Sequence, residues 1–457
     1  MWSVVLERFE RDAPACVMAH LALERAPSPG WIDEVFEAHR GRQYARELLF
    51  STVVESMALV ALGPRPSLHA AARRMPEPPV SLAALYAEVK RAEPALLRAL
   101  VRGGSERSAP VVTGVGREPG HETCPPGRRV RVLDGGHLPA SEERLAPLRD
   151  LRGAALPGHT LVAYDPDAGL VVDISPREDA HRSECVSAPP PLDGARPGQA
   201  WVADRHFCTV GLLGARRAAG AGFVVREHGR HPRPVEEGAW RACGRVETGA
   251  VRERAIAAGG QTTPWRRIEL VPDAPTGDGD RVLRLWSDLP AEVDAGHIAR
   301  LYRTRWEVEG VFRRLEGVPH GEIAGLGHPR AALPGFATAV VAHNVPSPIR
   351  RCVERTHRAE GQPAPEVSAY HPAWQIRGGH EGPLIAPPPE HRPSCGEADP
   401  AASAERLPRL ARHIDPRRVT ASERGPKAAK PKPHVDGAIA RAHVSTARVL
   451  AQARHRP

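Results

Sequence analysis

The spacing of apolar residues changes character several times along the chain. In residues 42–62 and 81–100, apolar side chains recur every three or four positions, which predicts amphipathic helices. Ser81 directly precedes the second apolar pattern, and serine is well suited to cap the first turn of a helix. We therefore expect residues 1–102 to form a helical domain, for which DNA binding is one of several possible roles.

Strand-like runs follow this helical region. A stretch rich in Gly, Ser and Pro over residues 103–127 indicates a linker. The run RVRVLDGG then predicts a short strand that ends at Asp134, and residues 159–176 predict a hairpin that turns at 165–169. The segment WVAD, which ends at Asp204, predicts another strand and precedes a helix-like stretch. Alternation of this kind predicts an α/β core.

We expect this core in two parts, residues 128–228 and 291–355. Between them, residues 229–290 contain short strand-like pieces among Gly, Pro and charged residues, which predicts a β-rich insertion. In the second part, a long helix is predicted over residues 294–315, with Asp294 as its cap and a glycine just past its end.

The C-terminal part of the chain departs from these patterns. Pro346 and Pro348 interrupt a helical pattern near the end of the core. Residues 356–457 are rich in Pro, Arg and His, which predicts a basic and partly disordered region. We expect sequence-independent DNA affinity from its basic residues Lys427, Lys430, Lys432, Arg441 and Arg448.

The charge composition favours a polyanionic partner. The chain has 63 Lys and Arg residues against 54 Asp and Glu, a net charge of +9, and all but four of the basic residues are arginine. A guanidinium group binds phosphate through paired hydrogen bonds, so nucleic acid is the leading candidate. Arginine richness is also typical of GC-rich genomes, which weakens the argument from composition alone.

Cysteine spacing and hydropathy exclude other classes of protein. None of the seven cysteines forms a CxxC pair, so we expect neither a zinc finger nor a disulfide framework. The N-terminal segment carries charges where a signal peptide needs an apolar core, and no apolar run approaches about 18 residues. These features predict a soluble cytoplasmic protein without a membrane partner.

Three carboxylates carry the candidate chemistry: Asp134, Asp204 and Glu309. Taken singly, they read as a turn residue, a helix N-cap and a solvated helix residue. Together, two aspartates at strand ends and a glutamate on a nearby helix can converge on one edge of a sheet. Such oxygen ligands suit Mg²⁺ or Mn²⁺, and two ions can activate an attacking oxygen and stabilise a leaving oxygen at a scissile phosphate.

The predicted helix arranges its polar residues in one stripe. At about 100° per residue, Tyr302, Arg305, Glu309 and Glu316 fall on one polar face, beside an apolar stripe. Glu307 points away from both stripes. Glu309 is therefore the better candidate for the third carboxylate.

Three segments resemble transposases of the insertion sequence four family. YRTRWEVEGVFRRLEG (302–317) resembles the family's Y-R-E-K signature helix, with matches at Tyr302, Arg305 and Glu309. Residues 132–149 and 201–213 resemble the regions of the first and second catalytic aspartates. Weaker similarity at residues 42–55 and 443–450 extends the resemblance over most of the chain.

The resemblance implies a ribonuclease-H-like core with a β-rich insertion between the second and third catalytic residues. It implies that Asp134, Asp204 and Glu309 ligate two Mg²⁺ or Mn²⁺ ions. The substrate would be double-stranded DNA at the inverted repeats of a mobile element, bound by a homodimer in the nucleoid.

The same resemblance assigns phosphate contacts to Tyr302 and Arg305, and we expect Arg313 to contribute to them. One position departs from the family pattern, because Glu316 stands where a lysine is expected. This departure, with Pro346 and Pro348, leaves open a decayed copy that retains only DNA binding. A nuclease without strand transfer and a purely structural protein are further alternatives.

Overall fold

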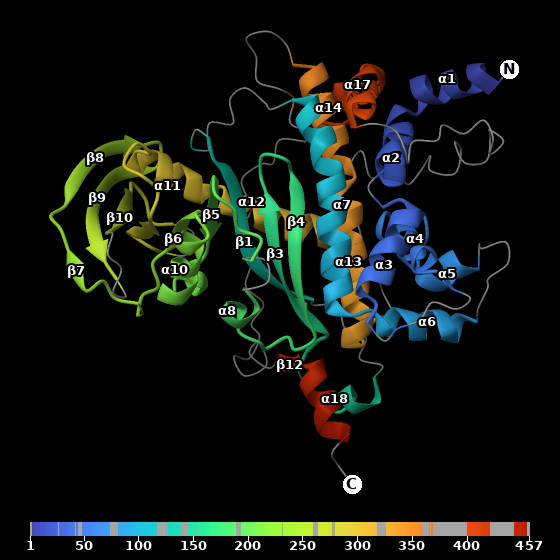
Figure 1. Ribbon diagram of the computed structural model, residues 1–457, viewed down its shortest axis with the longest axis horizontal. Helices are drawn as coiled ribbons and strands as arrows, with labels where there is room; N and C mark the ends of the chain where they lie inside the picture. The colour runs from blue at the N-terminus through green and yellow to red at the C-terminus, as the bar shows by residue number, and fades with distance from the viewer. Residues whose placement is uncertain are drawn as a thin grey trace.

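The computed structural model describes residues 2–25, 27–41, 43, 48–73, 81–116, 125, 127–138, 145–151, 153–188, 193–230, 232–258, 264–276, 279–317, 326–358, 365, 367–368, 400–420 and 443–454. N-terminal helices lie at one end of the molecule, a mixed sheet crosses its centre, and β-rich strands lie at the opposite end (Figure 1). The predicted α/β class is therefore confirmed at the level of a mixed fold with a large central sheet.

Ten of the described strands form one sheet in the order β4-β3-β1-β5-β6-β11-β10-β9-β7, with β8 paired to β9, and β2 and β12 form a second, two-stranded sheet. The core strands are β1 (Arg129–Leu138), β3 (Gly158–Asp165), β4 (Leu170–Arg177), β5 (Gln199–Ala203) and β6 (Gly222–Arg226). The strands of the insertion are β7 (Glu236–Glu237), β8 (Arg241–Val246), β9 (Gly249–Ala257), β10 (Trp265–Pro272) and β11 (Leu283–Ser287). Strands β1, β5 and β6 are parallel to one another, whereas β3, β4, β10 and β11 pair antiparallel.

Successive side chains of the core strands point to opposite faces of the sheet, and both faces are buried. Val132 and Val202 belong to a core cluster that also contains apolar residues of the helices near the signature motif. Leu133 and Trp201 face the other way, into a cluster with Phe223 and two further tryptophans. The predicted hairpin joins β3 to β4, where the left-handed turn residue is a glycine at φ 68°.

The helical end contains α1 (Trp2–Asp12), α2 (Pro14–Arg25), α3 (Pro29–His39), α4 (Phe50–Ala61), α5 (Leu68–Ala72), α6 (Leu82–Arg91) and α7 (Pro94–Val115). Ser81 caps α6 as predicted, since its hydroxyl accepts a hydrogen bond from the Ala84 N–H at 3.3 Å. The single helix expected over residues 81–100 is wrong, because α6 ends before Pro94 and α7 begins there.

The linker expected over residues 103–127 is wrong in its first half, because α7 continues to Val115. Glycines in this stretch serve helix packing. A Cβ at Gly103 would overlap the Trp31 ring, and a Cβ at Gly104 would meet Val341 at 3.9 Å. Helix α7 consequently packs along both β4 and α13 (Pro329–Asn344), beside which it lies in Figure 1.

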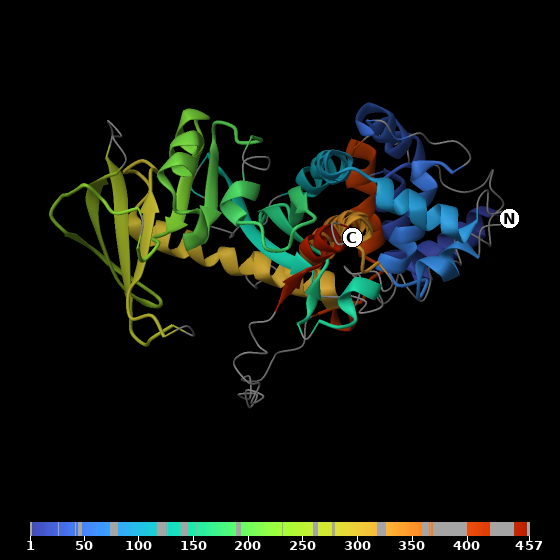
Figure 2. The same ribbon diagram turned by 90° about the horizontal axis from the view of Figure 1, so that it is seen from below.

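The long helix expected over residues 294–315 is two helices, α11 (Ala295–Arg303) and α12 (Arg305–Gly317). Asp294 caps α11 as predicted, accepting from the His297 N–H at 2.8 Å. The break occurs at Thr304, whose N–H and hydroxyl both donate to the Leu301 carbonyl oxygen, at 3.0 and 2.8 Å. The two helices, gold in Figure 2, lead from the insertion to the centre of the molecule.

Helices α13 and α14 (Pro346–Thr356) are separated at Val345, where the two prolines were expected to interrupt a helix. Shorter elements are α8 (Glu184–Ser187), α10 (Val210–Ala218), η1 (Ala146–Leu148), η2 (Arg205–Phe207), β2 (Ala155–Leu156), α17 (Pro400–Ala411), η4 (Pro416–Arg418), β12 (Val444–Ser445) and α18 (Thr446–Arg454). Strand β12 pairs with β2.

The predicted C-terminal region is described only in part. The basic residues Lys427, Lys430, Lys432 and Arg441 lie outside the described residues, as do 369–399. Arg448, in α18, forms an ion pair with Asp179, with nitrogen–oxygen distances of 2.8–3.0 Å. None of the described helices has both the length and the apolar character needed to cross a membrane.

Candidate active site

Asp134, Asp204 and Glu309 line one cavity of about 550 Å³. The other lining residues are Gly135, Gly136, His137, Glu184, Arg205, His206, Arg226, Arg305, Trp306 and Phe312. The structure thus brings the three predicted carboxylates to one edge of the sheet. Glu307, the rival for the third position, is not among the described lining residues.

The two aspartates are neighbours because their strands are parallel. Leu133 on β1 pairs with Ala203 on β5, so Asp134 and Asp204 occupy equivalent places on adjacent strands. Leu133 and Ala203 face away from the helices. The residues that follow them, Asp134 and Asp204, therefore face α11 and α12. Asp204 also caps η2, because its carboxylate accepts a hydrogen bond from the Arg205 N–H at 2.6 Å. Asp204 therefore has the N-cap role expected of it in addition to its place in the cavity.

The glycines after Asp134 have a different role from the one expected. They do not turn the backbone, because β1 continues to Leu138. A Cβ at Gly136 would overlap the Phe312 ring of α12, and a Cβ at Gly135 would overlap the Glu184 carboxylate. The two glycines therefore let α12 approach one face of β1 and Glu184 approach the other.

Arg305 joins the first and third carboxylates. Its Nη1 donates to Asp134 Oδ2 at 3.0 Å and its Nη2 to Glu309 Oε1 at 2.9 Å. The Arg305 side chain is only 10% exposed. A buried guanidinium thus pairs with two carboxylates within the cavity, and its single positive charge offsets one of their two negative charges.

The cavity has a strong effect on Asp134. Burial raises the pKa of Asp134 to about 6, opposed by the positive charge of Arg305 and reinforced by the negative charges of Glu184 and Asp204. Burial also raises the pKa of the Tyr302 hydroxyl, which stays a neutral donor. The neighbouring negative charges that reinforce this shift are ones that a bound cation would offset.

Tyr302 and Arg305 retain donor capacity. Neither the Tyr302 hydroxyl nor Arg305 Nε has a hydrogen-bond partner among the described residues, and both atoms are buried. Tyr302 is 3% exposed, and it lies just before the helix break. Phosphate oxygens are acceptors that would satisfy such donors, provided that the side chains turn toward the cavity.

The donor set fits a hard divalent cation, because it consists of carboxylate oxygens that already surround a positive group. As the side chains stand, however, no three His, Cys, Asp or Glu residues in the described ranges are placed to hold a metal ion. In this arrangement the Arg305 guanidinium bridges Asp134 and Glu309.

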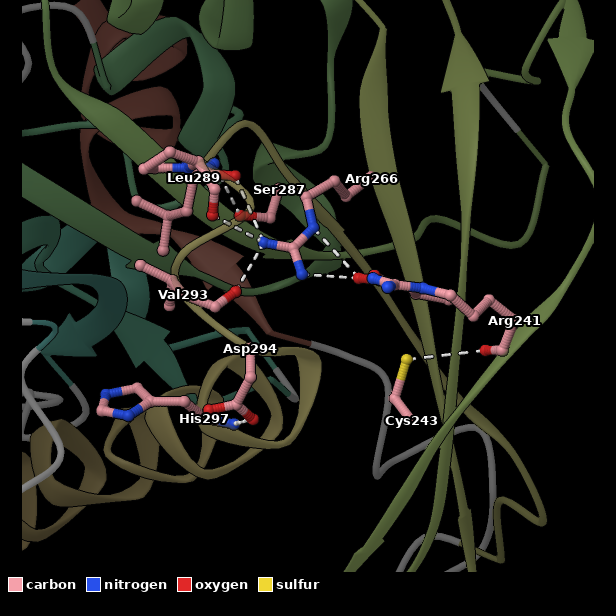
Figure 3. A network of polar contacts seen from close by, with 10 residues as sticks. Arg241, Cys243, Arg266, Ser287, Leu289, Val293, Asp294 and His297 are labelled. Atoms are coloured by element: carbon pink, nitrogen blue, oxygen red, sulfur yellow. Dashed lines mark hydrogen bonds and ion pairs between the residues drawn. The ribbon is translucent and has the colours of Figure 1, made fainter.

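The insertion holds the segment that enters α11 through Arg266, and it also contacts α11 itself, where Arg300 Nε lies 2.9 Å from Glu247 Oε1. Arg266 on β10 donates from Nη1 to the carbonyl oxygens of Leu289, Pro290 and Val293, at 3.3, 2.9 and 2.7 Å (Figure 3). Its Nε also donates to Glu253 Oε2 at 3.0 Å. The segment that enters α11 is therefore fixed to the sheet of the insertion.

Several site residues were not predicted from the sequence. Glu184 and His206 belong to no recognisable motif, and only the fold brings them to the cavity. Trp306 did carry a signal, because a tryptophan beside the polar stripe is unusual. It is 54% exposed, and the Arg305 guanidinium lies 5.0 Å from its ring centre.

Two predicted positions cannot be assessed in the same way. Arg313 and Glu316 lie within α12, but their side chains fall outside the described residues. Their expected roles toward DNA remain predictions.

Residues 125–322 match the family model described as "Transposase DDE domain". The match supports a DDE transposase. The matched segment begins before β1 and ends just after α12, so the DDE domain match contains all three carboxylates.

Other comparisons add little to the DDE domain match. No curated protein sequence matches the chain. One similar solved structure is a cryo-EM structure of the piggyBac transposase synaptic complex with hairpin DNA, with a TM-score of 0.34 and 11% identity. The similarity covers 91% of this chain and 86% of that one.

Proposed function

We propose that this chain is the transposase of an insertion sequence, which binds the terminal inverted repeats and cleaves and joins DNA strands with two divalent metal ions. The observation that carries the proposal is the convergence of Asp134, Asp204 and Glu309 on one cavity inside the segment that matches a transposase DDE domain. DDE transposases use divalent metal ions, and this donor set suits Mg²⁺ or Mn²⁺.

The assignment to the insertion sequence four family and its Y-R-E-K group rests on Tyr302, Arg305 and Glu309. It is supported by their placement at one junction, where α11 ends and α12 begins. A ribonuclease-H-like core is supported by the mixed sheet and by the strands of the insertion, which lie between Asp204 and Glu309 in the sequence.

Each residue would have a distinct task on DNA. Asp134, Asp204 and Glu309 would hold the metal ions, which supply Lewis-acid activation at the scissile phosphate. Arg305 would leave the carboxylates and bind phosphate, an exchange of one anionic partner for another. Tyr302 would donate its hydroxyl proton in a hydrogen bond to a phosphate oxygen, which a neutral phenol can do.

Double-stranded DNA is the proposed partner, at element ends and target, bound by a homodimer in the nucleoid. Arg205 and Arg226 also line the cavity, and Arg226 is ion-paired with Asp280 at 2.6 Å. An impaired transposase that only binds DNA is the second candidate, because Glu316 replaces the lysine of the family pattern. A carboxylate there cannot donate to phosphate.

Replacement of a proposed metal ligand tests the function. Asp204→Ala is expected to abolish cleavage of a duplex carrying the element's own terminal repeat, while leaving its binding, because the change removes a ligand and little phosphate contact. Asp134→Ala and Glu309→Ala are expected to behave alike, and Glu307→Ala is the matched control. Cleavage by Asp204→Ala at the parental rate in Mg²⁺ would refute the site.

A further inference from the structure

A second hollow adjoins the proposed metal site on the other face of β1. It has a volume of about 650 Å³, and its charged or nucleophilic lining residues are His137, His159, His181, Arg182, Glu184, Cys185, Arg205, His206, Cys208 and His228. Four residues line both hollows: His137, Glu184, Arg205 and His206. Glu184 is the single carboxylate among these four.

Glu184 contacts both of the segments that carry the catalytic aspartates. It is the first residue of α8, and its side chain is 26% exposed. One carboxylate oxygen lies 3.6 Å from Nε2 of the buried His159, and the other lies 3.3 Å from Nδ1 of His206. His159 pairs with His137 on β1, and His206 lies in η2, the turn that Asp204 caps.

The approach of Glu184 to β1 depends on a missing side chain. Its carboxylate lies where a Cβ at Gly135 would be, immediately beside Asp134 in the sequence. Glu184 therefore adds negative charge close to Asp134, whose pKa it helps to raise. Contact with His159 lowers the pKa of Glu184 itself, so that Glu184 is ionised at neutral pH.

We propose that Glu184 is a positioning residue of the metal site: it connects the strand end of Asp134 to the turn of Asp204 and adds a fourth negative charge to their cavity. This inference rests on the proposed function. Its two histidine contacts fix the carboxylate on the side of β1 opposite α12. A fixed charge there attracts a divalent cation without ligating it, and the two contacts hold the spacing that the ligands need.

The test is Mn²⁺ binding by the full chain, measured by titrating the free ion with electron paramagnetic resonance. Glu184→Gln keeps the size of the side chain and removes its charge, so it is expected to weaken Mn²⁺ binding about 10-fold. Its thermal midpoint without metal is expected to stay near that of the parent. Glu237→Gln is the matched control, since Glu237 is 30% exposed and contacts two arginines, Arg254 and Arg267, in the insertion.

A second variant separates this role from general damage to the fold. Gly135→Ala keeps every charge but displaces the flexible Glu184 side chain, so it too is expected to weaken Mn²⁺ binding. Because both changes act through one contact, the double variant is expected to bind no more weakly than Glu184→Gln alone. If Glu184→Gln does not fold, Gly135→Ala decides, and parental Mn²⁺ affinity in that variant overturns the proposal.

Two other outcomes are informative. Parental affinity in Glu184→Gln, or single effects that multiply in the double variant, also overturns the positioning role. Failure of the proposed function looks different: the parent chain binds no Mn²⁺, or Asp204→Asn binds it as well as the parent does.

Discussion

Arg305 is the residue on which the state of the cavity depends. It bridges Asp134 and Glu309, and it lies over the face of Trp306. In this position it supplies the positive charge that the carboxylates need when no metal ion is bound. The same side chain has a buried Nε atom with no hydrogen-bond acceptor among the described residues. Under the proposed function, metal ions and Arg305 would compete for the same carboxylates, and DNA phosphate would offer Arg305 another partner.

We predict that Arg305→Gln binds Mn²⁺ more tightly than the parent in the absence of DNA, because a competing cation is removed. The same variant without metal is expected to be less stable, by about 3 kcal/mol, since it leaves a buried carboxylate without its ionic partner. Mn²⁺ titration and thermal unfolding with and without the ion measure both effects. Equal Mn²⁺ affinity in the two proteins would exclude competition.

At the scale of elements, much of the fold could be predicted from local pattern. The hairpin, the caps Ser81 and Asp294, and the strand that ends just before Asp204 follow from residue type and period, whereas the strand expected to end at Asp134 continues to Leu138. The break at Thr304 could not be predicted in this way, because no glycine or proline marks it. It arises from a tightened last turn of α11, which depends on how that helix is held.

Tertiary contacts explain the other failures. Gly103 and Gly104 suggested a linker, but both lie within α7. A Cβ at Gly103 would overlap Trp31 and one at Gly104 would contact Val341, so the two glycines serve helix packing. Glu184 lies far from any motif, and it reaches the cavity only because α8 packs against β3 and η2 and its carboxylate lies against Gly135. Composition and spacing contain no information about such packing. The three carboxylates could be predicted because each lies in a recognisable local sequence pattern.

Arg266 is the basis of a prediction about how α11 is held. Its side chain is 15% exposed and binds three carbonyl groups and Glu253. Arg266→Met is expected to lower the free energy of unfolding by about 3 kcal/mol, because buried acceptors lose their donor. Urea denaturation measures the loss.

The matched control is Arg245→Met in the same sheet. Arg245 pairs with Asp273, and both side chains are 61% exposed, so a loss below about 1 kcal/mol is expected. Equal losses in the two variants would contradict a special role for Arg266.

At the scale of the whole molecule, one ion pair connects the helical end to the sheet. Arg98 on α7 donates to both oxygens of Asp173 on β4, at 2.9 and 2.8 Å. Asp173 is 5% exposed. The contact joins segments that the sequence pattern would assign to separate domains, so the two are expected to unfold together.

Arg98→Ala is therefore predicted to destabilise the chain by about 3 kcal/mol, because it leaves a buried carboxylate with only the more distant Arg102, whose Nε lies 4.0 Å from Asp173 Oδ2. Differential scanning calorimetry measures the change and shows whether unfolding splits into two transitions. Arg8→Ala is the control, because its pair with Asp12 is exposed, and it is expected to have almost no effect. An unsplit transition at the parental temperature for Arg98→Ala would refute the prediction.

The continuity of the sheet constrains the path of bound DNA. Strand β11 pairs directly with β6, so the insertion extends the core sheet without a break in the strand pairing. Neighbouring strands rotate by about 20–25°, so the five steps from β1 to β9 turn the sheet by roughly 100–125°. A straight duplex at the cavity cannot also lie flat along the outer strands. Simultaneous contact with both requires either a bent duplex or two separate duplex arms.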